Sequence, residues 1–321
     1  MQMRAMQVTG VGAPLQARDV PRPVPGPEEV LLRVRACGVN FADTLLAAGR
    51  YQERPDPPFT PGMEVCGTVV GTVAGGPPAG TRVAAFCGTG GFAEYLAVPA
   101  ARCVSVPDTL DDTAVAAFLI AYGTSHVALA YRAGLAPGET LLVLGAAGGV
   151  GLTAVELGRL MGARVIAVAR GAAKLEIARR AGAAHVIDAD ADVRAEVRAL
   201  GGADVVYDPV GGALFDAALR ACRPGARLLP IGFASGDVPQ IPANILLVKD
   251  LTVLGLYWGG FAARHPQVVA DSVSALVAWA AAGRITPHVS HVLPLDEAEA
   301  ALDLLRRRAA TGKVVLRMAD P

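Results

Sequence analysis

The sequence lacks the features of a secreted or membrane-spanning protein. Its five cysteines, at positions 37, 66, 87, 103 and 222, are odd in number, scattered and without a CxxC pair, which argues against a disulfide framework. Its longest apolar runs, such as 114–121, are far shorter than the ~20 residues of a membrane span. The opening MQMRAMQVTG has no apolar signal-peptide core. We therefore expect a cytoplasmic protein that does not associate with membranes.

The chain also lacks an excess of charge of either sign, with 29 Lys and Arg against 29 Asp and Glu. This balance excludes a whole-molecule attraction to nucleic acid or to an anionic membrane, although it is compatible with a local patch. What the sequence does have is apolar residues, 53% of 321, enough for a large core and for two domains. These properties favour a globular protein that binds small molecules and not nucleic acid.

The order of strand-like and helical patterns predicts an α/β fold. To about residue 115 the chain is β-rich, with short valine-rich runs bounded by Pro and Gly. The middle alternates strands with helices, which predicts a doubly wound parallel sheet of six strands. Those strands are expected at 141–144, 164–169, 185–188, 204–208, 226–231 and 252–257. The tail adds helices at 266–282 and 295–308 and strands at 289–293 and 313–318.

A glycine-rich stretch, TLLVLGAAGGVG at 140–151, follows the first strand of this alternation. Gly145 permits a tight turn, Gly148 and Gly149 leave room for a ligand to touch the main chain, and Gly151 lets the next helix pack closely. The free N–H groups of that helix then face a pyrophosphate. A merely structural turn is the alternative, and the βα context favours a dinucleotide. The residues that this turn predicts as cofactor contacts are Ala147, Gly148, Gly149 and Val150.

The end of the second strand predicts which dinucleotide binds. NAD-binding units place an acid there for the ribose 2′-hydroxyl, but this strand ends in Arg170, with Lys174 four residues later. Cations at this point would pair with a 2′-phosphate. The alternative is two solvated surface charges. The sequence therefore favours NADPH.

Seven segments spread along the whole chain resemble one family. They are CGVNFADTLLAAGRY (37–51), PFTPGMEVCGTV (58–69), AYGTSHVAL (121–129), PGETLLVLGAAGGVG (137–151), YDPVGG (207–212), NILLVKDLTVLGLYWGG (244–260) and TGKVVL (311–316). They resemble the medium-chain dehydrogenase/reductase superfamily and, within it, the zinc-independent NADPH:quinone oxidoreductase branch that includes zeta-crystallin. The resemblance implies a GroES-like, β-rich catalytic domain at 1–117 and 260–321. A Rossmann NADPH-binding domain at 118–259 is inserted in it, with the active site in the cleft between the two.

The same resemblance implies that no metal is bound. Zinc-dependent members hold their catalytic zinc with Cys, His and Cys, and here those positions correspond to Asn40, Met63 and Ala116. None of these side chains is a thiolate, imidazole or carboxylate ligand. Without a Lewis acid, alcohol oxidation loses its main driver. Hydride delivery to an electron-poor acceptor remains, with the protein supplying orientation and shielding.

The resemblance also assigns site residues. Asn40 and Tyr51 are expected to face the nicotinamide and the substrate and to hydrogen-bond a carbonyl; the alternatives are a turn Asn and a partly buried Tyr. Asp43 is expected to cap or brace the following helix. Asp188 stands where many relatives carry Tyr near the adenine, and an acid there weighs against NADPH unless it contacts adenine or ribose from the side. Further expected cofactor contacts are Thr124, Val210, Gly211, Ile231, Gly232, Phe233, Tyr257, Trp258 and Lys313.

Three functions follow as hypotheses. The first is NADPH-dependent reduction of quinones. The second uses the same residues to reduce α,β-unsaturated carbonyls, either free enones or an acyl-CoA thioester, and the third is a dinucleotide-binding protein without turnover. A homodimer is expected through the apolar sixth strand at 251–257, which lies at the sheet edge.

Overall fold

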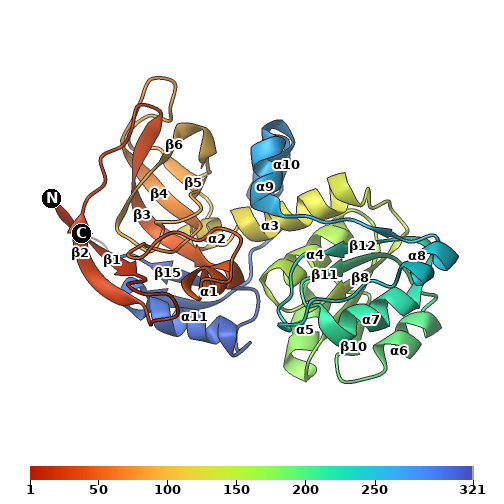
Figure 1. The fold of residues 1–321 in the computed structure, drawn as a ribbon. Coiled ribbons are helices and arrows are strands. Elements are labelled where there is room, and N and C mark those ends of the chain that lie inside the picture. Colours follow the sequence, from red (N-terminus) through yellow and green to blue (C-terminus); the bar gives the residue numbers. More distant parts are fainter. Residues whose placement is uncertain (320–321) are drawn as a thin grey trace. The chain divides into compact units, whose positions relative to one another are not determined.

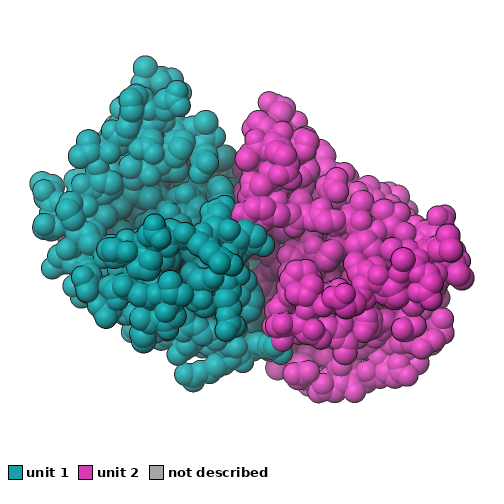
Figure 2. All heavy atoms as spheres, in the orientation of Figure 1, with its two compact units in different colours: residues 1–120, 277–321 teal, residues 121–276 magenta. Residues whose placement is uncertain are grey.

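The computed structural model describes residues 1–319, which form two compact units. The first unit comprises Met1–Ile120 and the chain from Val277 onward, and the second is the continuous segment Ala121–Leu276 (Figure 2). The unit boundaries therefore lie at 120/121 and 276/277. The sequence places the domain boundaries at 117/118 and 259/260, so the two divisions differ mainly in the assignment of residues 260–276.

The first unit is β-rich, as the sequence predicts. A seven-stranded sheet has the order β14-β15-β3-β4-β5-β7, with β6 also paired to β3, and β1 and β2 form a separate antiparallel pair. The strands are β1 (Gln2–Gln7), β2 (Gln16–Pro21), β3 (Glu29–Val39), β4 (Glu64–Gly71), β5 (Arg82–Phe86), β6 (Tyr95–Pro99), β7 (Cys103–Ser105), β14 (Val289–Pro294) and β15 (Lys313–Arg317). Its helices are α1 (Phe41–Ala47), α2 (Asp112–Ala116), α11 (Ala298–Arg306) and the 3₁₀ turns Ala100–Arg102 and Leu295–Glu297. Helix α3 (Leu119–His126) crosses the boundary to the second unit.

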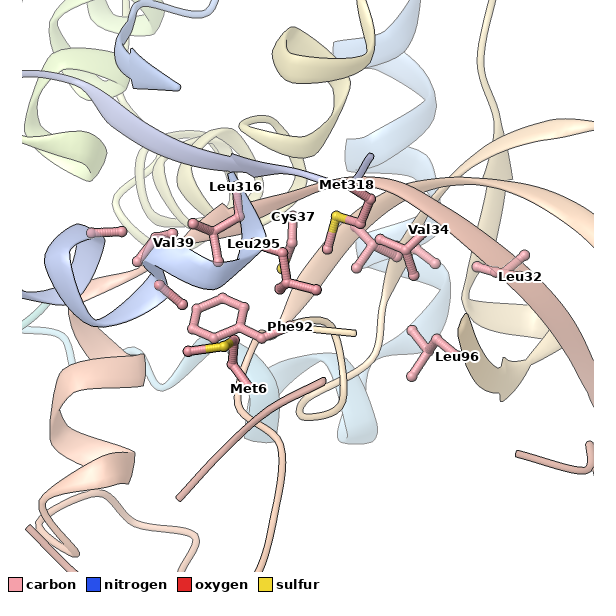
Figure 3. Packing of buried hydrophobic residues seen from close by; sticks show 14 of the residues in the cluster. Met6, Leu32, Val34, Cys37, Val39, Phe92, Leu96, Leu295, Leu316 and Met318 are labelled. Carbon is pink, nitrogen blue, oxygen red and sulfur yellow. The ribbon is translucent and has the colours of Figure 1, made fainter. Parts of the chain in front are cut away.

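One pairing in this sheet joins distant parts of the sequence. Strand β15 runs antiparallel to β3, with Val314 opposite Val39 and Leu316 opposite Cys37. The two strands share a buried apolar cluster to which Phe92 and Leu295 also belong (Figure 3). This register brings Lys313, at the start of β15, to the end of β3, where α1 begins.

The second unit holds the predicted doubly wound parallel sheet of six strands, in the order β10-β9-β8-β11-β12-β13. In chain order this is 3-2-1-4-5-6, the arrangement of Rossmann folds. The strands are β8 (Thr140–Leu144), β9 (Arg164–Ala169), β10 (His185–Asp188), β11 (Ala203–Asp208), β12 (Cys222–Pro230) and β13 (Thr252–Val253). Every residue of β8 is buried, as expected for a central strand covered on both faces.

Helices precede, connect and follow these strands (Figure 1). They are the π-helical segment Val127–Arg132, α4 (Gly149–Leu160), α5 (Ala172–Arg180), α6 (Val193–Ala199), α7 (Gly212–Ala221), α8 (Ala243–Lys249), α9 (Trp258–Arg264) and α10 (Pro266–Ala281), whose last residues belong to the first unit. The sixth strand is shorter than the predicted 252–257. The Leu254 N–H still donates to Leu228 O, but the chain then leaves the sheet at the exposed Gly255 and starts α9.

No helix within residues 1–319 combines the length and the apolar character needed to cross a bilayer.

Candidate functional site

The glycine-rich turn after β8 is built so closely that side chains would not fit. Gly145 has a φ of +59°, and a Cβ on it would lie 2.8 Å from Cγ2 of Val210. A Cβ on Gly151 would overlap the carbonyl oxygen of Gly145. Gly148 is the N-cap of α4, and its N–H donates to Gly145 O at 2.9 Å. The turn therefore leaves the main chain at the start of α4 open to a ligand, the arrangement that suits a phosphate group.

The turn after β11 lies against this glycine turn and is organised by a buried acid. The carboxylate of Asp208 accepts hydrogen bonds from the N–H groups of Val210 at 2.7 Å and Gly211 at 2.9 Å. Burial raises the pKa of this carboxyl group, and the two N–H groups oppose that effect. Asp208 was not among the expected site residues, although the acid directly before PVGG is a signal that could have been used.

The turn after β12 adjoins the turn after β11. A Cβ on Gly211 would lie 3.2 Å from the ring of Phe233, and the N–H groups of Ile231 and Gly232 donate to Asp208 O at 2.7 and 3.3 Å. The carboxyl ends of β8, β11 and β12 thus form one continuous edge. In doubly wound sheets this is the edge where ligands bind.

At the ends of β9 and β10, two acids and a cation face solvent. Arg170 is exposed and its Nε lies 3.1 Å from Oδ1 of Asp190. The carboxylate of Asp188 accepts the N–H groups of Asp190 and Gly171, each at 3.0 Å, and these bonds lower its pKa. Asp188 therefore shapes the loop around Arg170. Lys174 is half-buried in the first turn of α5.

At the start of α9, the aromatic side chain of Trp258 packs against α3. Trp258, the first residue of α9, is buried, and its ring lies 3.1 Å from the position that a Cβ on Gly123 would take. A side chain at position 123 would press on this ring. Thr124 is buried next to Gly123 in α3, and Tyr257 is the half-buried N-cap of α9.

The first unit contains a buried polar cluster at the junction of β3, α1, β4 and β15. Lys313 Nζ lies 2.8 Å from Oε1 of Glu64 and 2.6 Å from Oδ1 of Asn40. Asn40 Nδ2 donates to the same Glu64 oxygen at 2.9 Å. The exposed fractions are 9% for Asn40, 1% for Glu64 and 5% for Lys313. A buried charge pair of this kind persists because each charge is compensated by the other and by hydrogen bonds.

This cluster determines how the Asn40 amide is used. One N–H bonds to Glu64 and the other makes a longer bond of 3.3 Å to Gly38 O, while Oδ1 accepts from Lys313. Glu64 was not among the expected site residues, although it directly follows Met63 in PGMEVCG. Its partner Lys313 is 249 residues away in the sequence.

Asp43 fixes the start of α1, as the sequence predicts. Its carboxylate accepts the Asn40 N–H at 2.8 Å and the Gly62 N–H at 3.0 Å and is fully buried. Burial raises the pKa of Asp43 to about 7, and the two backbone N–H groups and Lys313 oppose that rise. Tyr51 lies in the loop after α1 and is half-buried.

The three residues that the resemblance aligns with the zinc ligands, Asn40, Met63 and Ala116, are all buried. Within residues 1–319, no three His, Cys, Asp or Glu side chains are placed to hold a metal ion together. The thiol of Cys37 donates to Glu64 O at 3.1 Å, and burial raises its pKa well above the usual range. Cys37 is therefore a protonated packing residue.

A Rossmann unit with a glycine turn, joined to a GroES-like β-rich unit, defines the class of two-domain dinucleotide-dependent oxidoreductases. Residues 26–108 match the family model described as an alcohol dehydrogenase GroES-like domain, and residues 149–276 match that of a zinc-binding dehydrogenase. The chain belongs to the medium-chain dehydrogenase/reductase superfamily, in its quinone oxidoreductase-like branch. It is thus an NAD(P)-dependent oxidoreductase.

Individual relatives match over nearly the full chain. A quinone oxidoreductase-like protein 2 homolog from Nematostella vectensis is 38% identical over 98% of this chain and 88% of its own. A quinone oxidoreductase from Thermus thermophilus, whose structures include a complex with NADPH, is 37% identical, covers 98% of this chain and 100% of its own, and superimposes with a TM-score of 0.87. A mycobacterial protein solved with NADPH is 33% identical, covers 98% and 99%, and has a TM-score of 0.92.

Proposed function

We propose that the protein is a metal-independent, NADPH-dependent quinone oxidoreductase. The observation that carries the proposal is the cluster of Asn40, Glu64 and Lys313, in which an amide bonded to a lysine occupies the position of a zinc ligand. Such a site has no Lewis acid for polarising an alcohol. It suits an acceptor that is already electron-poor, and the Thermus relative is named as a quinone oxidoreductase.

The cofactor side of the proposal rests on the carboxyl edge of the parallel sheet. The main-chain N–H groups of Gly149 and Val150 would hold the pyrophosphate, with Gly148 beside it, whose own N–H is bonded to Gly145 O. Arg170 and Lys174 would hold a 2′-phosphate, which makes NADPH the proposed cofactor. The Asp188 carboxylate already accepts the main-chain N–H groups of Gly171 and Asp190, and these bonds partly compensate its negative charge. The presence of Asp188 near the ribose site is therefore a weaker argument for NADH.

Further cofactor contacts are proposed from the other turns along this edge. Those residues are Ala147, Val210, Gly211, Ile231, Gly232 and Phe233, which lie at the ends of β8, β11 and β12. Asp188 is proposed to meet the adenine or ribose from the side. Thr124, Tyr257 and Trp258 are proposed nearer the nicotinamide, which supplies a hydride when it is bound.

On the substrate side, Asn40 and Tyr51 are the proposed partners of the acceptor carbonyl. Asn40 Nδ2 donates to Glu64 at 2.9 Å and to Gly38 O at 3.3 Å. Because the bond to Gly38 O is the longer, its hydrogen is the one most readily turned to a substrate. Lys313 holds the amide through Oδ1. We therefore assign Lys313 to positioning Asn40, whereas the sequence alone suggests a direct cofactor contact.

The test is NADPH consumption with a panel of quinones, free enones and enoyl-CoA thioesters. Rapid turnover of quinones, unchanged after dialysis against a strong chelator and without stoichiometric zinc in elemental analysis, is the expected result. Turnover confined to enones or thioesters would favour the second hypothesis. Absence of turnover with retained NADPH binding would favour the third. Activity lost to the chelator and restored by zinc would overturn the metal-independent proposal.

Replacement of Asn40 tests its role directly. In Asn40→Ala the rate with a quinone should fall by about fivefold to 150-fold, because an orienting hydrogen bond at a desolvated site is worth ~1–3 kcal/mol. Lys313 keeps its bond to Glu64 in this variant, so the fold should persist. Tyr51→Phe is the matched variant, and a loss there too would make its phenol a second carbonyl partner. An Asn40→Ala enzyme as fast as the parent would remove Asn40 from the site.

A further inference from the structure

A second concave site lies in the Rossmann unit away from the glycine turn. It is a pocket of about 300 Å³ between α6, α7 and α8. Four cationic side chains line it, with the amide of Asn244 and no acidic residue. The four are Arg194 and Arg198 from α6, Arg220 from the last turn of α7, and Lys249 from the end of α8.

These cations are not neutralised by the chain. In the part of the chain that the structure describes, none of the four makes an ion pair, whereas arginines elsewhere in this unit do, as Arg179, Arg180, Arg223 and Arg227 show. The whole chain has equal numbers of positive and negative residues. The four unpaired cations around this pocket are therefore a local excess of positive charge in a chain whose positive and negative residues are equal in number.

The cations also act on one another. Lys249 Nζ is held by the last carbonyl groups of α7, donating to Arg220 O at 3.1 Å. Burial lowers the pKa of Lys249, and the charges of Arg198 and Arg194 lower it further. Like charges kept this close repel. An anion in the hollow would relieve that repulsion.

The topology separates this pocket from the cofactor edge. Helix α7 starts at the carboxyl end of β11 and runs back, so Arg220, in its last turn, lies toward the amino ends of the strands. Lys249 lies three residues before β13 begins. The glycine turn, by contrast, follows the carboxyl end of β8.

We propose that this pocket is a second anion site, which binds a phosphate-bearing ligand. Several arginines converging on one hollow match the geometry of phosphate oxygens, which accept paired guanidinium N–H bonds. The volume lies at the lower end of the range for small-molecule sites, which suits one or two phosphate groups. Ile245 and Val248 line the same pocket and supply an apolar side for the ester group. A soluble phosphate ester and a phospholipid headgroup share this chemistry.

Calorimetric titration with inorganic pyrophosphate at low salt tests the proposal. The parent is compared with the Arg198→Gln/Arg220→Gln variant and with a matched control, Arg179→Gln/Arg180→Gln, whose arginines are paired to Glu176 on α5. The pocket variant should bind pyrophosphate at least tenfold more weakly than the parent, and the control should bind as the parent does. Pyrophosphate that binds at the glycine turn should contribute equally to all three titrations, because none of the substitutions changes that turn. Absence of binding to the parent, or equal affinity in all three, would overturn the proposal.

A second arm identifies the source of the phosphate. The same three proteins are sedimented with phosphatidylcholine vesicles with and without phosphatidic acid. Sedimentation that requires phosphatidic acid and is lost in the pocket variant assigns the site to a lipid headgroup, and pyrophosphate binding without sedimentation assigns it to a soluble ligand. NADPH oxidation by the pocket variant should equal that of the parent, because none of its substitutions touches the glycine turn.

Discussion

At the scale of single residues, Lys313 and Glu64 form a buried pair of opposite charges in the first unit. Both are almost fully buried and lie 2.8 Å apart. Their separation in the sequence explains why residue patterns did not reveal the pair, since nothing local marks a lysine at 313 as the partner of an acid at 64. Arg170 differs, because its position at a strand end is local information and was predictable.

A double-mutant cycle should reveal the coupling of the pair. Glu64→Gln and Lys313→Met should each lower the free energy of unfolding by ~3–5 kcal/mol, because each leaves one buried charge without its partner. The double variant should lose clearly less than the sum of the two. Denaturant unfolding of the four proteins measures the cycle. Strictly additive losses would show that the two charges do not stabilise each other.

The cofactor preference depends on Arg170. In Arg170→Ala the dissociation constant for NADPH should rise by a factor that corresponds to ~1.5–3 kcal/mol, while that for NADH should change little, because only NADPH carries the 2′-phosphate. Fluorescence titration measures both constants. Arg180→Ala, an exposed arginine of α5, is the control. Equal affinity of the parent for NADPH and NADH would contradict the assignment.

At the scale of elements, the order of strands and helices was predictable and the ends of elements were not. The alternation of apolar runs with helical patterns correctly predicted six parallel strands, because each run is long enough to be a buried strand. The sixth strand is shorter than its apolar run, since Gly255 offers no side chain to pack and Tyr257 already caps α9. The turn after β11 was expected from the family resemblance and from its place at the end of a parallel strand, but the role of Asp208 also depends on its burial, which the sequence does not report.

Asp43, in the first turn of α1, should make the free energy of unfolding depend on pH. The pKa of Asp43 is about 7 in the folded protein, against an ordinary value of 3.8. Between pH 3.8 and about pH 7, Asp43 is therefore protonated in the folded state and ionised in the unfolded state. This contribution to stability is complete below pH 3.8 and decreases, by at most ~1.4 kcal/mol per pH unit, until about pH 7.

The comparison that isolates this effect is Asp43→Asn, in which the group no longer titrates. Unfolding of both proteins is measured from pH 4 to 8. The stability of the parent relative to the variant should fall as the pH rises to about 7 and then stay constant. A difference that does not vary with pH would mean that Asp43 has the same pKa in both states.

At the scale of the whole molecule, we expect two copies to associate through the edge of the six-stranded sheet. Strand β13 is the edge strand, and next to it in the sequence α8 exposes Leu247 by 83% and Val248 by 82%. A strand at the sheet edge and large exposed apolar side chains favour pairing.

Sedimentation equilibrium measures this association. The mass should approach that of a dimer as the concentration rises, and Leu247→Glu should shift the equilibrium toward the monomer, since the added charge opposes burial of this side chain. Tyr131→Glu, at an exposed aromatic of the same unit, is the control. A parent mass that stays monomeric at all concentrations would reject the dimer.

The pairing of β15 with β3 has a consequence for the order in which the protein takes shape on the ribosome. Residues 121–276 form the Rossmann unit from one continuous segment, so every residue that this unit needs has been synthesised before residue 277 is added. The first unit has to wait, because the cation for Glu64 and one of the three strands that pair with β3 are synthesised only at residue 313 and beyond. Domains generally fold as units during synthesis. We therefore expect the inserted unit to fold first, while the β-rich unit that begins the chain is completed last.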